Sequence, residues 1–167
     1  MKIRTETARD IEAIERVVAS AFPTNAEAAL VNALRAARKL RVSLIAERAG
    51  SVVGHVALSP VTLEPPHRSI SLLGLAPVAV LPEFQRQGIG SALIEHGLEA
   101  CRNLKIDGVV VLGEPAFYGR FGFRSASGFG LSNEYSAGDA FMALELQMSC
   151  FAGINALAQY APQFADL

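Results

Sequence analysis

The sequence has no tryptophan, only two cysteines and almost no net charge. Its 167 residues include 15 basic and 16 acidic side chains, which leaves a net charge of −1. The basic residues are scattered along the chain, so no surface for a nucleic-acid backbone is predicted. Cys101 and Cys150 have no cysteine or histidine at ligand spacing, and we expect buried thiols there instead of a metal or redox site. The three histidines are equally dispersed, and the sequence predicts no metal site.

Long hydrophobic runs are absent as well. The longest run, residues 72–81, is interrupted by Gly74 and Pro77 and is far shorter than the ~20 residues that a membrane helix needs. We therefore expect a buried strand there and no membrane segment. The amino terminus is rich in charged residues, which predicts a cytoplasmic protein without a secretory signal.

The chain does contain apolar residues in a regular pattern. Hydrophobic residues make up 51% of the sequence, enough for one core in a chain of single-domain length. Thr7 with Asp10 matches the capping box of a helix. The alternation of strands and helices indicates the α/β class. The periodicity predicts helices at 11–21, after Asn25 and at 88–104, and strands at 2–6, 42–47, 52–63, 69–81, 109–113, 129–131 and 141–146.

An anion site is predicted where the strand at 69–81 is followed by the next helix. The connecting loop contains Gln85 and Arg86, and Gly88 and Gly90 begin the helix. Backbone amides at a helix start have no partner inside the helix, and the macrodipole adds about half a positive charge there. Glycines let the backbone approach an oxyanion closely, and Arg86 adds a permanent positive charge. The sequence therefore predicts a phosphate or pyrophosphate ligand.

Two other phosphate-binding patterns fit this loop poorly. A Walker loop requires Lys followed by Ser or Thr, and no such pair comes after Gly90. The dinucleotide fingerprint matches Gly88 and Gly90, and Glu114 follows at about the distance of a ribose-binding acid. It fails at Leu93, where a small residue is required. A nucleotide-dependent oxidoreductase is therefore a distant alternative.

The loop resembles the acetyl-CoA loop of the GCN5-related N-acetyltransferase (GNAT) family. The family signature is Gln or Arg, two residues, Gly, one residue, and Gly or Ala, and Gln85, Gly88 and Gly90 match it. Residues 117–123 resemble a second family segment, in which a strand precedes a short helix with a Tyr, here Tyr118, and then a Gly–Phe pair. Both motifs stand in the family's order, and the resemblance covers roughly residues 1–147.

The resemblance implies a fold and a cosubstrate. The implied fold is a single-domain α/β acyl-CoA N-acyltransferase with a mixed central sheet of six to seven strands flanked by helices and splayed between the fourth and fifth strands. The N-acetyltransferase domain would span residues 1–147, and the apolar tail 148–167 would pack back on it. Acetyl-CoA is the implied cosubstrate, with no metal. The residues implied to bind it are Val78, Ala79, Val80, Gln85, Arg86, Gln87, Gly88, Ile89, Gly90, Ser91, Phe117 and Phe121.

The resemblance also implies direct transfer of an acetyl group from acetyl-CoA to a primary amine. A backbone N–H near Val78 or Ala79 would polarise the thioester carbonyl, and Tyr118 would protonate the departing sulfur. A Tyr between two Phe residues is also typical of a core residue anchored by one hydrogen bond. Glu114 is the first candidate for the base, although helix capping explains it equally well. Glu83 is a weaker candidate, and a water chain would make a dedicated base unnecessary.

The acceptor is the least determined part of the prediction. We expect its pocket to come from the first two helices, the hairpin strands and the loop at 132–139. Acidic residues there give either a rim suited to a cationic amine or a solvated surface, namely Glu27, Glu64, Glu134 and Asp139. The partner is a small-molecule or peptide amine, and the apolar tail is compatible with a homodimer or a monomer. The alternative function is a non-catalytic acyl-CoA-binding sensor or assembly module, which would bind the thioester without consuming it.

Overall fold

The computed structural model describes residues 1–167 and shows an α/β fold. The helices are α1 (Ile11–Ala21), α2 (Ala26–Ala36), α3 (Ile89–Asn103) and the short α4 (Pro115–Tyr118). None of them has the length and apolar character required to cross a membrane. The strands are β1 (Lys2–Thr5), β2 (Val42–Arg48), β3 (Ser51–Glu64), β4 (Leu72–Val80), β5 (Gly108–Leu112), β6 (Arg124–Ser125), β7 (Leu131–Asn133), β8 (Phe141–Glu145) and β9 (Ala156–Tyr160).

The sheet is mixed and contains nine strands. Seven of them follow the hydrogen-bonded order β1-β2-β3-β4-β5-β8-β6, and β9 pairs with β3 and β7 outside this path. The pair β4–β5 is parallel, whereas β1–β2, β2–β3 and β5–β8 are antiparallel. The predicted fold class, with a mixed sheet and flanking helices, is confirmed.

The chain forms two compact units. The first consists of Met1–Ser59, Ala76–Cys101 and Pro162–Leu167, and the second consists of Pro60–Leu75 and Arg102–Ala161. Strands β3 and β4 therefore contribute residues to both units. Within residues 148–167, β9 belongs to the second unit and the last residues belong to the first.

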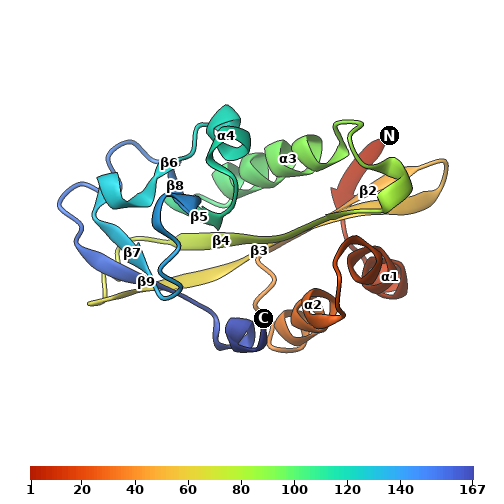
Figure 1. Ribbon diagram of the computed structural model, residues 1–167, viewed down its shortest axis with the longest axis horizontal. Coiled ribbons are helices and arrows are strands. Elements are labelled where there is room, and N and C mark those ends of the chain that lie inside the picture. Colours follow the sequence, from red (N-terminus) through yellow and green to blue (C-terminus); the bar gives the residue numbers. More distant parts are fainter. The chain divides into compact units, whose positions relative to one another are not determined.

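In the first unit, α1 and α2 lie on one face of the strands and α3 lies on the other (Figure 1). The apolar side of α1 contributes Ile14 to a buried cluster that also contains Val31 of α2 and Ile45 of β2. On the opposite face, Gly54 makes room for α3, because a Cβ atom there would lie 2.9 Å from Cδ1 of Leu93. The apolar periodicity of each helix thus determines which side it buries.

The capping box that the sequence predicts holds the 3-10 turn Ala8–Asp10, which leads directly into α1. The carboxylate of Asp10 accepts hydrogen bonds from the backbone N–H of Thr7 at 2.7 Å and from its hydroxyl at 3.1 Å. Arg4 of β1 donates two further hydrogen bonds to this carboxylate, at 2.8 and 3.0 Å. Arg4 also contacts Glu47 of β2 at 3.2 Å, so one guanidinium connects the helix start to two strands.

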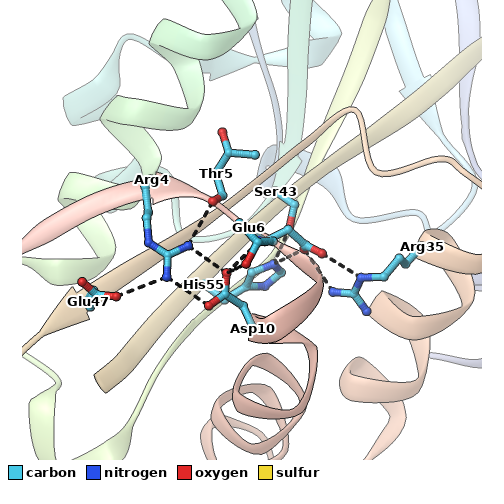
Figure 2. A network of polar contacts seen from close by, with 9 residues as sticks. Arg4, Thr5, Glu6, Asp10, Arg35, Ser43, Glu47 and His55 are labelled. Atoms are coloured by element: carbon cyan, nitrogen blue, oxygen red, sulfur yellow. Dashed lines mark hydrogen bonds and ion pairs between the residues drawn. The ribbon is translucent and has the colours of Figure 1, made fainter. Parts of the chain in front are cut away.

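A second polar network lies inside the first unit and connects Glu6, Arg35, Ser43 and His55 (Figure 2). Glu6 accepts two hydrogen bonds from Arg35, at 2.8 and 3.0 Å, and one from the hydroxyl of Ser43. The Ser43 Oγ lies 2.8 Å from Nε2 of His55, which is completely buried. Because a carboxylate only accepts, Ser43 donates to Glu6 and accepts from His55, so the ring proton is on Nε2. Nδ1 of His55 is then a buried acceptor without a hydrogen-bond partner.

The protonation states of these buried groups follow from their neighbours. Burial alone would raise the pKa of Glu6, but interactions with His55, Arg35 and Ser43 outweigh it and lower the pKa to about 2. Burial lowers the pKa of His55, so its ring is neutral at neutral pH. The hydrogen bonds from Arg4 hold the pKa of the Asp10 carboxyl well below its usual range. Both carboxylates are therefore ionised at neutral pH.

In the second unit, β4 and β5 pair over only three residues each. Leu72–Gly74 pairs with Gly108–Val110, although β4 continues to Val80 and β5 to Leu112. On its other side β5 pairs with β8 over its whole length. The ladder between β4 and β5 thus ends at Gly74, in agreement with the predicted splay between the fourth and fifth strands.

Three elements of the second unit differ from the prediction. The sequence predicts a strand at 129–131, but Ala126–Phe129 forms a 3-10 turn and β7 begins at Leu131. The physical reason is Gly130, which has φ +76° and whose Cβ would collide with the carbonyl of Ile154. The prediction also lacks the two-residue strand β6 and the strand β9, whose apolar residues are assigned to a tail that packs back on the domain.

The two cysteines have no disulfide partner. Cys101 is fully buried in α3, as the sequence predicts. Cys150 is half-buried, and its thiol donates to the carbonyl of Asp107 at 3.2 Å. Burial, helped by the charges of Glu145 and Asp107, raises the pKa of Cys150 to about 11. A thiol in this state is a poor nucleophile at neutral pH.

Candidate active site

The predicted anion loop lies in the first unit, between β4 and α3. It begins with the 3-10 turn Pro82–Phe84 and continues through Gln85 to Gly88, all four of which are exposed. The side-chain amide of Gln85 donates to the carbonyl of Val80 at 3.0 Å. The signature glutamine thus fastens the loop to the end of β4.

The backbone of this loop presents unpaired amides. Arg86 has φ 62° and Gly88 has φ 84°, both in the left-handed region. Such changes of handedness point successive N–H groups into one concave surface. The first helical hydrogen bond of α3 runs from the Ala92 N–H to the Gly88 carbonyl at 3.0 Å, so the amides of Ile89 and Gly90 precede it and have no helical partner. A Cβ atom at Gly88 would meet nothing within 4 Å, which means that the rim of this surface is open.

Arg48 is a second cation at this loop, and the sequence analysis does not identify it. It is the last residue of β2, and its Nη1 donates to Oε1 of Gln87 at 2.7 Å. The guanidinium also lies 5.6 Å from the ring centroid of Phe84. Arg86 is exposed on the same loop. Two permanent positive charges, on Arg48 and Arg86, therefore flank the unpaired amides. No local sequence signal could have identified Arg48.

The other predicted binding residues of this unit lie along the same stretch of chain. Val78 and Val80 are half-buried, whereas the side chain of Ala79 packs in the cluster under α1 and α2. Ile89 is buried, so only its backbone amide is available to a ligand. Ser91 is half-buried in the first turn of α3. The structure thus places the end of β4, the loop and the start of α3 in one continuous path.

In the second unit, Tyr118 ends the short helix α4 and lies in an aromatic cluster. Its ring centroid is 5.0 Å from that of Phe117, 6.3 Å from Phe121 and 5.8 Å from Phe123. The ring also fills the space next to Gly113, where a Cβ atom would collide with it. The aromatic contacts, together with the space left by the absence of a side chain at Gly113, fix the position of the Tyr118 ring. Burial raises the pKa of Tyr118, so the phenol keeps its proton at neutral pH.

Glu114 lies between β5 and α4 and is exposed. Its carbonyl accepts hydrogen bonds from the backbone N–H groups of Phe117 and Tyr118, at 3.1 and 3.0 Å. Its carboxylate makes no capping hydrogen bond. The backbone of Glu114 therefore starts the helix, which leaves the side chain available for another role.

A helix-start cradle thus follows β4, and a phenol held in an aromatic cluster follows β5. A sequence profile of the acetyltransferase (GNAT) domain matches residues 2–126, and the chain belongs to this family. It is 33% identical over 166 residues to the uncharacterized N-acetyltransferase YhbS of Escherichia coli K12, with 98% of both chains covered. It is also 36% identical over 121 residues to the uncharacterized N-acetyltransferase YjhQ of the same strain, covering 71% of this chain and 67% of that protein.

Solved structures share the fold. The crystal structure of the GNAT family N-acetyltransferase YhbS from Escherichia coli in complex with CoA has a TM-score of 0.92 and 32% identity, covering 98% of this chain and 91% of that chain. A GNAT family acetyltransferase from Brucella melitensis in complex with acetyl-CoA has a TM-score of 0.81 and 33% identity, covering 98% and 97%. The predicted family is confirmed, and the protein is an acetyltransferase.

Proposed function

We propose that this protein transfers the acetyl group of acetyl-CoA directly to a primary amine. The observation that carries the proposal is the open row of amides at Gly88–Gly90, flanked by Arg48 and Arg86. Such a row at a helix start suits a pyrophosphate. The similar structures from Escherichia coli and Brucella melitensis contain CoA and acetyl-CoA, which supports the same cosubstrate here.

The cosubstrate would lie along the predicted binding residues. Its pyrophosphate would accept hydrogen bonds from the backbone between Gln85 and Ser91, and the side chains of Arg86 and Gln87 would border it. The residues Val78–Val80 of β4 would bind the pantetheine arm as an additional strand does. Phe117 and Phe121, both half-buried, would supply apolar contact.

The chemistry requires one new bond and one broken bond. The nitrogen of the neutral amine attacks the thioester carbon, the C–N bond forms, and the C–S bond breaks with release of the CoA thiolate. A backbone N–H at Val78 or Ala79 would stabilise the oxyanion of the tetrahedral intermediate. Tyr118 would donate its phenolic proton to the sulfur, and Glu114 would take the proton of the amine directly or through water.

The substitution Tyr118→Phe tests this assignment. Phe keeps the ring contacts with Phe117 and Phe123 and removes only the hydroxyl. We expect acetyl-CoA-dependent thiol release to fall about 100-fold or more, since a general acid contributes roughly that much. The increase in melting temperature caused by acetyl-CoA should remain as in the wild type. Ser127→Ala, which also removes one hydroxyl from the second unit, is the control and should keep most of its activity.

Two results would contradict the proposed function. The first is a wild-type protein that acetyl-CoA does not stabilise in a thermal titration. The second is a protein that acetyl-CoA stabilises but that releases no thiol with a broad panel of amines, as expected of a sensor or assembly module.

A further inference from the structure

All three tyrosines of the chain lie in the second unit, where strands end. Tyr118 follows β5 at the end of α4, Tyr135 follows β7, and Tyr160 is the last residue of β9. The reaction proposed above uses only Tyr118. Tyr135 and Tyr160 have no role in it.

The strands that lead to these tyrosines run in the same direction. β4 is parallel to β5, and β7 is parallel to β9. β9 is antiparallel to β3. The strands β3 and β4 are neighbours in the sheet, and the loop that joins them is too short for a parallel crossover, so β3 and β4 are also antiparallel. The carboxyl ends of β5, β7 and β9 therefore face one edge. Open α/β sheets bind their ligands at such an edge.

The register of β7 and β9 places two of the tyrosines opposite each other. Asn133 of β7 pairs with Ala158 of β9, and Tyr135 and Tyr160 each follow two residues later. Their ring centroids are 6.0 Å apart, with an angle of 33° between the planes. The Asn133 side chain accepts hydrogen bonds from the N–H groups of Tyr135 and Ala137, at 2.8 and 3.3 Å. The turn that carries Tyr135 is thus held in place by the side chain of Asn133.

Tyr160 lies at the position where β4 and β5 separate. Its ring fills the space next to Gly74, where a Cβ atom would collide with it, and Gly74 with Val110 forms the last pair between the two strands. The side chain of Tyr160 is 8% exposed, whereas that of Tyr135 is 47% exposed. One ring therefore lies at the base of the splay and the other faces solvent above it.

The phenols of Tyr118 and Tyr135 both act on the ionisation of Tyr160. Burial raises the pKa of Tyr160, and Tyr135 and Tyr118 raise it further. The charge of Glu134 acts on Tyr135 in addition to the effect of burial, and a negative charge at this position would attract an ammonium ion.

On the basis of the acetyl transfer proposed above, we propose that Tyr135 and Tyr160 form an aromatic wall of the acceptor subsite, at the sheet edge where β5, the strand that leads to Tyr118, also ends. The acceptor that fits this wall is a primary amine on an apolar carbon skeleton. The exposed ring of Tyr135, which packs against Tyr160, contacts the skeleton, and a cationic amine is attracted by its electron density before it loses its proton.

A selectivity measurement tests the proposal. We compare cyclohexylmethylamine, an apolar amine, with ethanolamine, a polar one, by acetyl-CoA-dependent thiol release. Tyr135→Ala should raise the KM for cyclohexylmethylamine about tenfold or more, while the KM values for ethanolamine and acetyl-CoA stay the same. Tyr135→Phe keeps the ring and should restore the wild-type KM. Met148→Ala, at a position that is 95% exposed, is the control for an unrelated surface change in this unit.

A second measurement does not depend on turnover. Because the chain has no tryptophan, its intrinsic fluorescence comes from these three tyrosines. Adding cyclohexylmethylamine, which does not absorb, to the CoA complex should change this emission at concentrations where ethanolamine does not. The change should be much smaller in Tyr135→Phe.

The outcomes separate this proposal from the proposed function. If Tyr135→Ala changes the KM of both amines equally, or if the amine leaves the emission unchanged, the aromatic subsite is wrong and acetyl transfer can still be right. If the amine changes the emission but wild-type protein releases no thiol with any amine, the subsite is supported and the catalytic proposal is contradicted.

Discussion

At the scale of single residues, the buried polar network of the first unit shows how this core accommodates charge. Glu6 and Arg35 are 14% and 19% exposed, and each would be costly to bury without the other. Ser43 connects their ion pair to His55. The network joins the end of β1 to β2, β3 and α2, so a few side chains determine how four elements meet.

The substitution Glu6→Gln should destabilise the fold because it leaves the guanidinium of Arg35 without a charged partner. We expect the free energy of unfolding to fall by about 3 kcal/mol, as for other partly buried ion pairs that lose one member. Denaturation by urea measures this change. Glu12→Gln, on the exposed side of α1, is the control and should stay within about 0.5 kcal/mol of the wild type. An equal loss in both variants would contradict the role assigned to the network.

At the scale of elements, the junction of β4 and α3 combines a strand end, a turn and a helix start. Gln85 binds the carbonyl of Val80, and Arg48 reaches across from β2 to Gln87. The helix start supplies amides, and the left-handed residues orient them. The junction therefore needs a glycine at position 88, both for the backbone shape and for the access of a ligand.

The substitution Gly88→Ala tests this junction, and Gly50→Ala is its matched control. The two glycines have φ values of 84° and 80°, and a Cβ at either would meet nothing within 4 Å. Both variants should lose about 1 kcal/mol of stability from backbone strain. Only Gly88→Ala should weaken the binding of acetyl-CoA, by about tenfold, because its methyl group occupies the space above the amides. Isothermal titration calorimetry measures the binding, and similar Kd values for both variants would contradict the cradle.

At the scale of the whole molecule, the structure relies on ionised carboxylates although the net charge is only −1. The pKa values of Glu6 and Asp10 are both lowered in the folded protein. A lowered pKa means that the folded state binds protons more weakly than the unfolded chain. Acid therefore favours unfolding.

The pH dependence of stability should follow from these shifts. The contribution of Glu6 is fully present above its ordinary pKa of 4.5 and is lost as the pH falls toward about 2. We expect a loss on the order of 2 kcal/mol from this residue over that range. Urea denaturation of the wild type and of Glu6→Gln at decreasing pH measures this loss. The difference in free energy of unfolding between the two proteins should become smaller as the pH falls. A difference in free energy of unfolding that stays constant down to pH values near the pKa of Glu6 in the folded protein would contradict this assignment.

The local features of the candidate site were predictable. Gln85, Gly88 and Gly90 lie within six residues of one another, so their spacing alone indicates a helix-start anion site. Tyr118 follows a strand in a second local motif. Arg48 was not predictable, because its contact with Gln87 joins residues 39 positions apart. The same holds for Tyr135 and Tyr160, which meet only through the pairing of β7 with β9.

The sequence by itself determined the helices, most of the strands and the chemistry of the loop, because apolar periodicity and glycine spacing act over a few neighbouring residues. Only the tertiary structure decided that β9 pairs with both β3 and β7 and that the pairing of β4 with β5 stops at Gly74. Strand partners and register depend on side chains that meet from distant parts of the chain. The cradle could therefore be predicted, and the contact between Tyr135 and Tyr160 could not.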